Sequence, residues 1–376
     1  MILENDNKKY RVLFIKEKHM AKIKAAVIFG GTAREHALSL ASAAEVIQNI
    51  PRDKYEVVCI GITRKGRWLF FPGSPEEIAD GSWEQNTDCT SAFISPDPLH
   101  RGIITIENGE TSVKKIDVVL PILMGKRGGD GTIQGLLDLS GIPYVGSGVL
   151  TCASCMDKSH THMVMDNYDI KTPEWELITQ REINELDRRC SEIAARFGYS
   201  LVVKPANSGS NSGVSFVNTP EEFMAAVKLA FSNDNKVIVE KYVRARKLEA
   251  AVFGYDTPVC SPIGEIIADH KIYDPRDFNV SSGDDLTIPA DISPETEKKA
   301  REIAVTAFKA LGCRGMARVD LFLTDDGDLL LNKIGTMPGL RSSSVFSKLM
   351  EQLGYDHEEL IDMLLEQAVE NSDRTY

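Results

Sequence analysis

The 376-residue chain lacks any long apolar run. No stretch approaches the ~20 apolar residues that a membrane span needs, so we expect no membrane association. An excess of positive charge is also missing, because 55 acidic residues outnumber 43 lysines and arginines and give a net charge of -12. Non-specific nucleic-acid binding needs a basic face. We therefore expect no nucleic-acid partner.

A disulfide framework is absent as well. The seven cysteines are odd in number and scattered along the chain, which suits a reducing compartment. We therefore expect a cytoplasmic protein. Cys152 and Cys155 form a CxxC pair, but no second pair completes a zinc site. We interpret them as buried core thiols.

The chain also lacks a secretory signal, because residues 1–20 contain Lys, Glu and Asp and no long apolar run. We expect residues 1–21 to be a disordered extension. The whole chain has 43% hydrophobic and 26% charged residues, as in a globular protein. Its length is enough for two or three compact domains.

Apolar strand-like segments alternate with helical patterns in residues 22–149. "KIKAAVIF" ends at two glycines and precedes the helix-like "EHALSLASAAEVIQNI"; "YEVVCIGIT" and "IDVVLPIL" come later as further strands. This alternation predicts an N-terminal domain with a parallel sheet. The predicted fold class is α/β (α+β).

Two further units are expected, at residues 150–236 and 237–376. The first contains the strands "LVVKP" and "GVSFV"; the second contains a helix that begins after Ser293 and a hairpin across "DDGD". The segment "VVKPANSGSNSGV" places Lys204 before a Gly/Ser-rich loop, a pattern that suits phosphate binding. A flexible hairpin loop is an equally good interpretation at this point.

Two other segments carry polar residues on apolar strands. In "VIVEKYV" the strand ends in Glu-Lys, which can contact an adenine edge or simply keep an edge strand soluble. In "ARVDLFLTDDGDLLLNKI", Arg318 and Asp320 share one strand face, and the antiparallel partner should bring Asn332 close. These groups suit phosphoryl transfer with a metal ion, or a solvent-side ion pair.

Together the segments resemble those of the D-alanine–D-alanine ligases of the ATP-grasp superfamily, from about residue 22 to the C-terminus. The D-alanine–D-lactate and D-alanine–D-serine ligases are the subgroup most similar. The matching segments, in order, are "VIFGGTAREHALSLASA", "LPILMGKRGGDGTIQGLLDLSGIPYVGSG", "CMDKSHT", "LVVKPANSGSNSGV", "VIVEKYV", "LGCRGMARVDLF" and "NKIGTMPGLRSSS". The resemblance implies three domains, with ATP between the last two.

The resemblance also implies roles for individual residues. Glu35 would hold the ammonium of the first substrate and Ser344 the carboxylate of the second. Arg318 would stabilise the transferring phosphoryl group, Asp320 would bind magnesium, and Gly339 would supply an oxyanion-type N–H. Ser210 would join Glu35, Arg318 and Gly339 in catalysis. The implied nucleotide contacts are Lys158, Lys204, Ser210, Glu240, Lys241, Val243 and Asn332.

Several residues depart from the family pattern. The family segment "NEVNT" is "NKIGT" here, so Lys333 replaces a bridging carboxylate and Gly335 an amide oxygen. A protonated lysine cannot ligate magnesium. It can stand in for one metal electrostatically, but a weakened metal site is the interpretation that the sequence favours. The other replacements are Met124, Gly129, Lys247, Asn211, Pro275 and Phe278, with Glu249, Lys271 and Arg276 as possible substitutes nearby.

The leading hypothesis is an ATP-dependent ligase that joins D-alanine to a second D-amino acid through an acyl phosphate, for peptidoglycan precursor synthesis. The implied cofactors are ATP and Mg²⁺ or Mn²⁺, the implied partners are small-molecule substrates, and the implied assembly is a homodimer formed through the first domain. Two alternatives stay open. One is a catalytically impaired paralogue that binds nucleotide or a partner protein, and the other is a ligase for a different second substrate.

Overall fold

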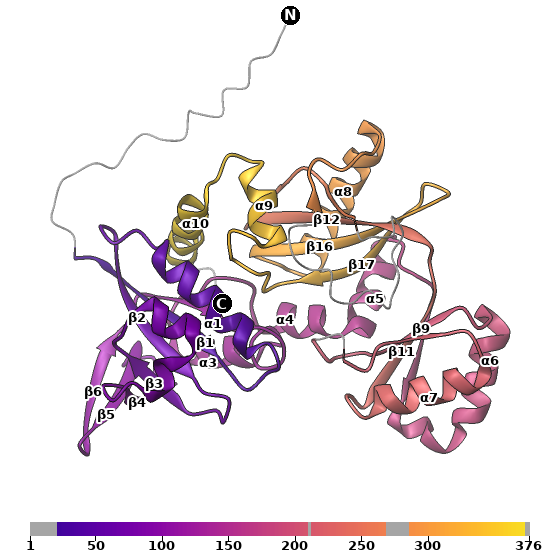
Figure 1. Cartoon of the computed structure of the whole chain (residues 1–376). Coiled ribbons are helices and arrows are strands. Elements are labelled where there is room, and N and C mark those ends of the chain that lie inside the picture. Colours follow the sequence, from indigo (N-terminus) through magenta and orange to yellow (C-terminus); the bar gives the residue numbers. More distant parts are fainter. Residues whose placement is uncertain (1–20, 210–211, 268–285, 373–376) are drawn as a thin grey trace, which may run out of the picture.

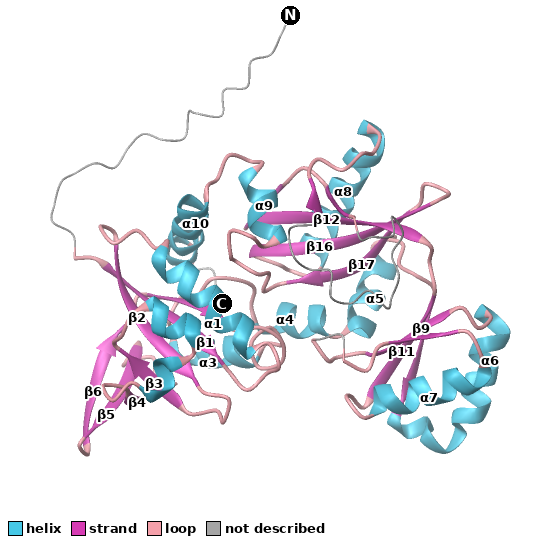
Figure 2. Cartoon of the chain, viewed as in Figure 1, coloured by secondary structure: helices cyan, strands magenta, loops and turns pink. Residues whose placement is uncertain are grey.

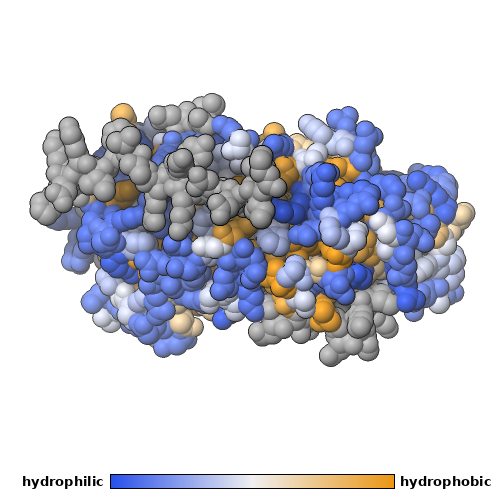
Figure 3. All heavy atoms as spheres, turned by 90° about the horizontal axis from the view of Figure 1, so that it is seen from above, coloured by the Kyte–Doolittle hydropathy of each residue, from blue (hydrophilic) through white to orange (hydrophobic). Residues whose placement is uncertain are grey.

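The computed structural model describes residues 21–209, 212–267 and 286–372. Three sheets succeed one another along the chain, each with its own helices (Figures 1 and 2). Hydrophilic side chains cover most of the face seen in Figure 3, and hydrophobic ones gather near its middle. Within the described ranges, no helix has both the length and the apolar character needed to cross a membrane.

The first sheet has seven strands in the order β6-β5-β4-β3-β2-β1-β7. β1 pairs parallel with β2 and β7, as predicted, but β2 to β6 pair antiparallel, so the expected parallel sheet is in fact mixed. Short connections such as that between β5 and β6 allow only antiparallel pairing. The strands are β1 (Ile23–Gly30), β2 (Tyr55–Ile62), β3 (Trp68–Phe71), β4 (Thr90–Ile94), β5 (Gly102–Glu107), β6 (Glu110–Lys115) and β7 (Val118–Ile122).

Both faces of the first sheet are covered by helices. Val27 and Phe29 of β1 face one core, and Ala26 and Ile28 face the other, because successive strand side chains point in opposite directions. The first core includes residues of α10, which comes from the far end of the chain and lies beside this sheet (Figure 1). The helices around the sheet are α1 (His36–Gln48), α2 (Pro75–Asp80), the 3-10 turn η1 (Ser82–Gln85), α3 (Thr132–Ser140) and α10 (His357–Glu370).

The second sheet has four antiparallel strands in the order β10-β9-β11-β8. Its core is formed by α6, α7 and the buried strand residues that face them. The predicted strand–loop–strand around Lys204 is confirmed as β9 and β10, which pair with each other. The elements are β8 (Trp175–Thr179), η2 (Gln180–Glu185), α6 (Leu186–Phe197), β9 (Leu201–Pro205), β10 (Ser215–Val217), α7 (Pro220–Phe231) and β11 (Lys236–Lys241).

The third sheet has the order β15-β14-β12-β16-β17, with β13 paired to β12. The predicted hairpin is confirmed as β16 and β17, and Ser293 caps α8 as expected, since its Oγ accepts from the N–H of Thr296 at 3.1 Å. The elements are β12 (Ala245–Gly254), β13 (Val259–Cys260), β14 (Gly264–Ile266), β15 (Leu286–Thr287), α8 (Pro294–Ala310), β16 (Gly315–Thr324), β17 (Leu329–Gly335) and α9 (Val345–Glu351).

The unit boundaries differ from those expected at residues 150 and 237. Strand β11 begins at Lys236 but pairs with β8 and β9, so the change to the third sheet comes after Lys241. Helices α4 (Val149–Met156) and α5 (Lys158–Asn167) precede the second sheet, yet Cys155 and Met165 pack in the core of the third. Cys152 is buried too, so both CxxC thiols are core residues, as interpreted. These assignments depend on pairing and packing between distant segments, which local composition does not predict.

The start of α5 is held by Asp157. Its Oδ1 accepts from the backbone N–H of Ser159 at 3.0 Å and of His160 at 3.3 Å, and its Oδ2 pairs with the ammonium of Lys236. An N-cap carboxylate satisfies helix N–H groups that otherwise have no partner. The cap therefore fixes where α5 begins, and with it the position of the next residue, Lys158.

We expect Asp157→Ala to lower the free energy of unfolding by about 1–2 kcal/mol, because the cap is lost, and by somewhat more because Lys236 loses its partner. Urea denaturation followed by circular dichroism measures this change. Asp157→Asn, which can still cap, should cost less. The matched control is Asp356→Ala, which removes the cap of α10, where Oδ1 accepts from the N–H of Glu359 at 2.9 Å. An Asp157→Ala protein as stable as the wild type would contradict the assigned cap.

Candidate functional site

The ends of the second and third sheets bring charged side chains together around the start of α5. Strand β9 supplies Lys204, β11 supplies Glu240, and β16 and β17 supply Arg318, Asp320 and Lys333. Figure 1 shows α5 lying between the two sheets. The Lys204 strand and the Arg318 hairpin therefore belong to the two sheets that flank α5.

Glu240 is the centre of a buried polar cluster. Its Oε2 lies 2.6 Å from Nζ of Lys204, and its Oε1 lies 3.2 Å from Nε2 of His162. The side chains of Lys204 and His162 are almost fully buried. Burial disfavours the charged carboxylate, but Lys204 and His162 outweigh it and lower the pKa of Glu240 to about 2. The His162 ring also stacks on Trp175, with ring centroids 5.2 Å apart. The cluster therefore fixes Lys204 at the end of β9.

Lys158 opens α5 and faces the same space. Burial, then the positive charges of Lys204 and Lys333, lower the pKa of its ammonium to about 8. Such mutual repulsion between cations is relieved when an anion binds among them. Three lysines from three different elements are thus gathered where a polyanion would be stabilised.

The other residues expected at the nucleotide lie nearby, with different exposure. The Lys241 side chain is exposed and pairs with Glu174 at 2.9 Å, while Val243 is half-buried just after β11. Asn332 is the extra residue of a β-bulge in β17, next to the pairing of Asp320 with Lys333. The hairpin therefore brings Asn332 beside Asp320, as its register predicted.

Arg318 is held between two carboxylates on neighbouring strands. Its Nε and Nη2 donate to Oδ1 and Oδ2 of Asp320 at 2.7 and 2.9 Å, and its Nε lies 3.0 Å from Oε2 of Glu249. The register pairs Glu249 of β12 with Asp320 of β16, so both acids lie on one face of the sheet. A bidentate arginine–carboxylate pair fixes the guanidinium plane as well as its charge.

Two lysines complete this ion-paired face. Nζ of Lys247 lies 2.7 Å from Oε1 of Glu249, and Nζ of Lys333 lies 3.9 Å from Oδ2 of Asp320. Burial raises the pKa of Asp320, but Arg318, Lys333 and Lys247 together hold it well below its usual range. Three cations thus surround two carboxylates.

These residues do not fit the magnesium ion that the family resemblance implies. Magnesium takes oxygen ligands, and a protein usually offers it one or two carboxylates. Both oxygens of Asp320 already accept from Arg318, and the position expected to hold a second carboxylate is Lys333. In the described ranges, no three His, Cys, Asp or Glu side chains are grouped so that they could hold a metal.

The residues expected to bind substrate, Glu35 and Ser344, lie in the N-terminal domain and at the start of α9. Gly125 has a φ of +73°, a backbone conformation that favours glycine, and a methyl group added there would lie 2.6 Å from Oε2 of Glu35. A methyl group at Gly339 would lie 2.7 Å from Oγ of Ser344, which places these two predicted residues in contact. The two pairs belong to different domains.

The loop after β9 contacts the N-terminal domain on both sides of its undescribed residues. A methyl group at Gly209 would lie 3.3 Å from Cα of Gly125, and Nη1 of Arg34 donates to Oγ of Ser212 at 2.7 Å. The loop therefore lies against the N-terminal domain. The predicted positions that fall outside the described residues are Ser210, Asn211, Lys271, Pro275, Arg276 and Phe278.

The replacements Met124 and Gly129 lie in apolar surroundings. Met124 lines a small gap with Met316, Met337 and other apolar residues, and a methyl group at Gly129 would lie 3.6 Å from Cγ of Met337. Apolar contacts thus occupy the place of the histidine and the acid that the family pattern predicts there.

His162 is a member of the buried cluster that the sequence interpretation missed. It lies four residues after Lys158 on α5, so the two share one helix face. That spacing was a usable signal, because a polar residue on the same face as a site lysine points toward the same groups.

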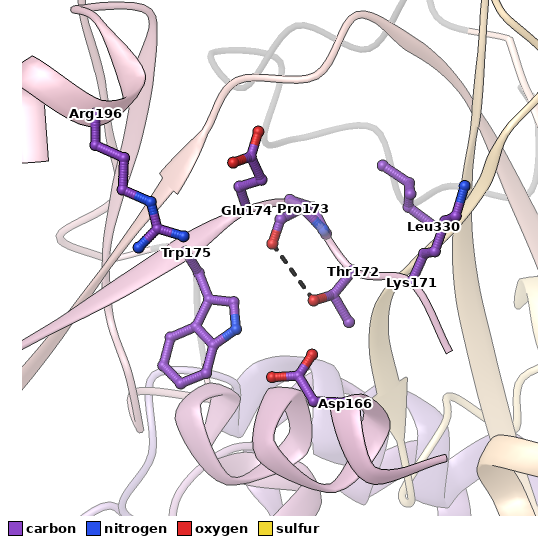
Figure 4. A pocket seen from close by; sticks show the side chains of 8 residues that line it. All are labelled: Asp166, Lys171, Thr172, Pro173, Glu174, Trp175, Arg196 and Leu330. Carbon is purple, nitrogen blue, oxygen red and sulfur yellow. Dashed lines mark hydrogen bonds between the residues drawn. The ribbon is translucent and has the colours of Figure 1, made fainter. Parts of the chain in front are cut away.

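A cavity lies beside this cluster, next to Trp175. It has a volume of about 630 Å³ and opens between α5, the segment before β8, α6 and β17 (Figure 4). Trp175, whose ring stacks on His162, forms part of its wall. Its lining residues are Asp166, Lys171, Thr172, Pro173, Glu174, Trp175, Arg196 and Leu330.

Comparison with known proteins agrees with this arrangement. The family model described as "D-ala D-ala ligase N-terminus" matches residues 24–147, and the one described as "D-ala D-ala ligase C-terminus" matches residues 164–366. A D-alanine–D-alanine ligase of Thermoanaerobacter sp. (strain X514) is 41% identical over 355 residues, which cover 94% of this chain and 98% of that protein.

Solved structures of related ligases have the same fold. The VanG D-Ala:D-Ser ligase of Enterococcus faecalis superposes with a TM-score of 0.84 at 34% identity, covering 93% of this chain and all of that one. The D-alanine–D-alanine ligase of Coxiella burnetii gives 0.81 at 31% identity, covering 94% and 97%. From its two domain matches and this full-length similarity, the chain belongs to the D-alanine–D-alanine ligase family, with the ATP-grasp fold.

Proposed function

We propose that the chain is an ATP-dependent ligase that joins D-alanine to a second D-amino acid, in the cytoplasm, for peptidoglycan precursor synthesis. The observation that carries the proposal is the convergence of three lysines, Lys158, Lys204 and Lys333, with an arginine fixed by two carboxylates. The full-length similarity to ligases of this name supports the substrate class.

In this mechanism, the γ-phosphoryl group of ATP passes to a carboxylate oxygen of D-alanine and leaves ADP. The amine of the second substrate then attacks the acyl carbon, phosphate leaves, and a proton is released. Lys158 and Lys204 would hold the phosphates, and Arg318 would stabilise the charge on the transferring group. No step needs a magnesium ion bound at Asp320, so Mg²⁺ or Mn²⁺ stays an expectation from the resemblance.

The substrate contacts are part of the same proposal. Glu35 would pair with the ammonium of the first D-alanine, and Ser344 would donate to the carboxylate of the second substrate. The backbone N–H of Gly339, in contact with Ser344, would stabilise the oxyanion of the tetrahedral intermediate. Ser210 would join them from the loop after β9. These positions come from matching family motifs.

A second candidate is a nucleotide-binding paralogue without turnover. It is favoured by one observation, the Lys333 ammonium 3.9 Å from Asp320 in place of a metal-binding carboxylate. Release of ADP with D-alanine separates the two candidates. ATP binding without any ADP release, across D-alanine, D-serine and D-lactate as second substrates, would overturn the ligase proposal.

We expect Arg318→Lys to lower kcat by about a thousandfold, because a lysine cannot keep the bidentate pair with Asp320 and places its charge differently. A coupled ADP-release assay measures the loss. The matched control is Arg246→Lys, which breaks a similar pair with Glu265, at 2.6 Å, on the opposite face of β12. The control should retain near-normal kcat; an equal loss in both variants would indicate a structural effect only.

We expect ATP to bind more weakly as the pH rises above about 8. The pKa of Lys158 is lowered to about 8 in the free protein, so its positive charge is present below that pH and lost above it. Isothermal titration calorimetry between about pH 6.5 and about pH 9.5 would show the fall. Lys158→Arg, which stays protonated throughout, should flatten the profile, and an unchanged slope in that variant would contradict the assignment.

We also propose that the chain forms a homodimer through its first domain, as the resemblance implies. Leu139 on α3 has an exposed fraction of 64%, so its side chain is available for such a contact. Light scattering should give twice the mass of one chain, and Leu139→Glu should lower it. Leu229→Glu on α7, a site 51% exposed in the second sheet unit, is the control. A monomeric wild type would contradict the proposal.

A further inference from the structure

The ion-paired face of the third sheet carries more positive charge than its own carboxylates need. Lys247, Arg318 and Lys333 surround Glu249 and Asp320, and each cation lies within 4.0 Å of one of these acids. All five side chains project from β12, β16 and β17 on one face, because their positions alternate with buried core residues. The excess charge therefore points away from the core.

The lysines on the nucleotide side add to this excess. Lys204 is matched by Glu240, but the positive charges of Lys204 and Lys333 both act on Lys158 and lower its pKa. Lys333 of β17 and Lys204 of β9 lie on the two sheets that flank α5, the helix that Lys158 begins (Figure 1). A triphosphate, which carries several negative charges, fits such a space.

The Lys333 ammonium reaches this space from solvent. Its side chain is 48% exposed, while the carboxylate of Asp320 that it approaches is 3% exposed. Lys247, with 18% exposure, is anchored on Glu249 at 2.7 Å. The Lys247 ammonium is therefore fixed in place, whereas the Lys333 ammonium retains the freedom to move toward a bound phosphate.

A divalent ion has little to bind here. Asp320 accepts two hydrogen bonds from Arg318, Glu249 lies against Lys247 and Arg318, and a protonated lysine has no lone pair to donate. A metal placed among these groups would also be repelled by three neighbouring cations. These side chains therefore favour neutralisation of phosphate charge by lysine ammonium groups, not by a metal ion.

We propose that Lys247 and Lys333 replace a divalent metal ion in neutralising the ATP phosphates, so that this chain binds ATP without magnesium. The inference rests on the proposed nucleotide site. It concerns binding, and it holds for an active ligase and for a paralogue without turnover.

Isothermal titration calorimetry of ATP, in EDTA and in excess magnesium chloride, tests the proposal on the full chain. We expect magnesium to raise the affinity by less than about threefold, or to lower it, because the metal cancels charge that the lysines already neutralise. A rise larger than this would overturn the inference but leave nucleotide binding intact. Absence of binding in both buffers would overturn the proposed function as well.

A pair of variants sharpens the test. Lys333→Glu combined with Gly335→Asn restores the oxygen ligands of the family pattern, and we expect it to weaken ATP binding in EDTA by at least about tenfold and to regain affinity with magnesium. The control Lys298→Glu makes the same change of charge on α8, where the lysine side chain is 77% exposed and lies 3.9 Å from Glu302. The control should bind like the wild type. A double variant whose ATP affinity is as insensitive to magnesium as that of the wild type would overturn the inference. Circular dichroism confirms that each variant is folded.

Discussion

The ion pairing of Arg318 with Asp320 and Glu249 is the constraint on which the site depends. Two carboxylates are buried on one face of the third sheet, and removing them from water is costly unless cations and hydrogen-bond donors compensate. The backbone register of β12 and β16 puts the acids side by side, so the guanidinium between them has one favoured orientation. Lys247 and Lys333 pair with these same two carboxylates, so their positions depend on the arrangement of the acids.

Much of the local structure was predictable from the sequence. Period-two alternation placed Arg318 and Asp320 on one face, and the turn "DDGD" identified the hairpin that brings Lys333 and Asn332 opposite them. Lys204 at the end of an apolar strand was recognised in the same way. These features depend on neighbours in sequence, for which spacing and residue type are sufficient evidence.

The features that were not predictable depend on contacts between distant segments. Strand β11 joins the second sheet because β8 and β9 pair with it on both sides. The first sheet is mixed because β3 to β6 are added antiparallel beside β2. The bond from His162 to Glu240 spans 78 positions. The ion-pair partners of Lys247 and Lys333 are likewise set by strand register, which the segment "NKIGT" alone does not predict.

Helix α10 has a consequence for how the chain is made. Leu360, Ile361 and Leu364 of this helix pack in the same core as Val27 and Phe29 of β1, although the two segments lie at opposite ends of the chain. During synthesis, α1 and α2 can pack on this face early, whereas the part of the core that α10 supplies is missing until the final residues emerge. The core of the first domain is therefore completed only at the end of translation.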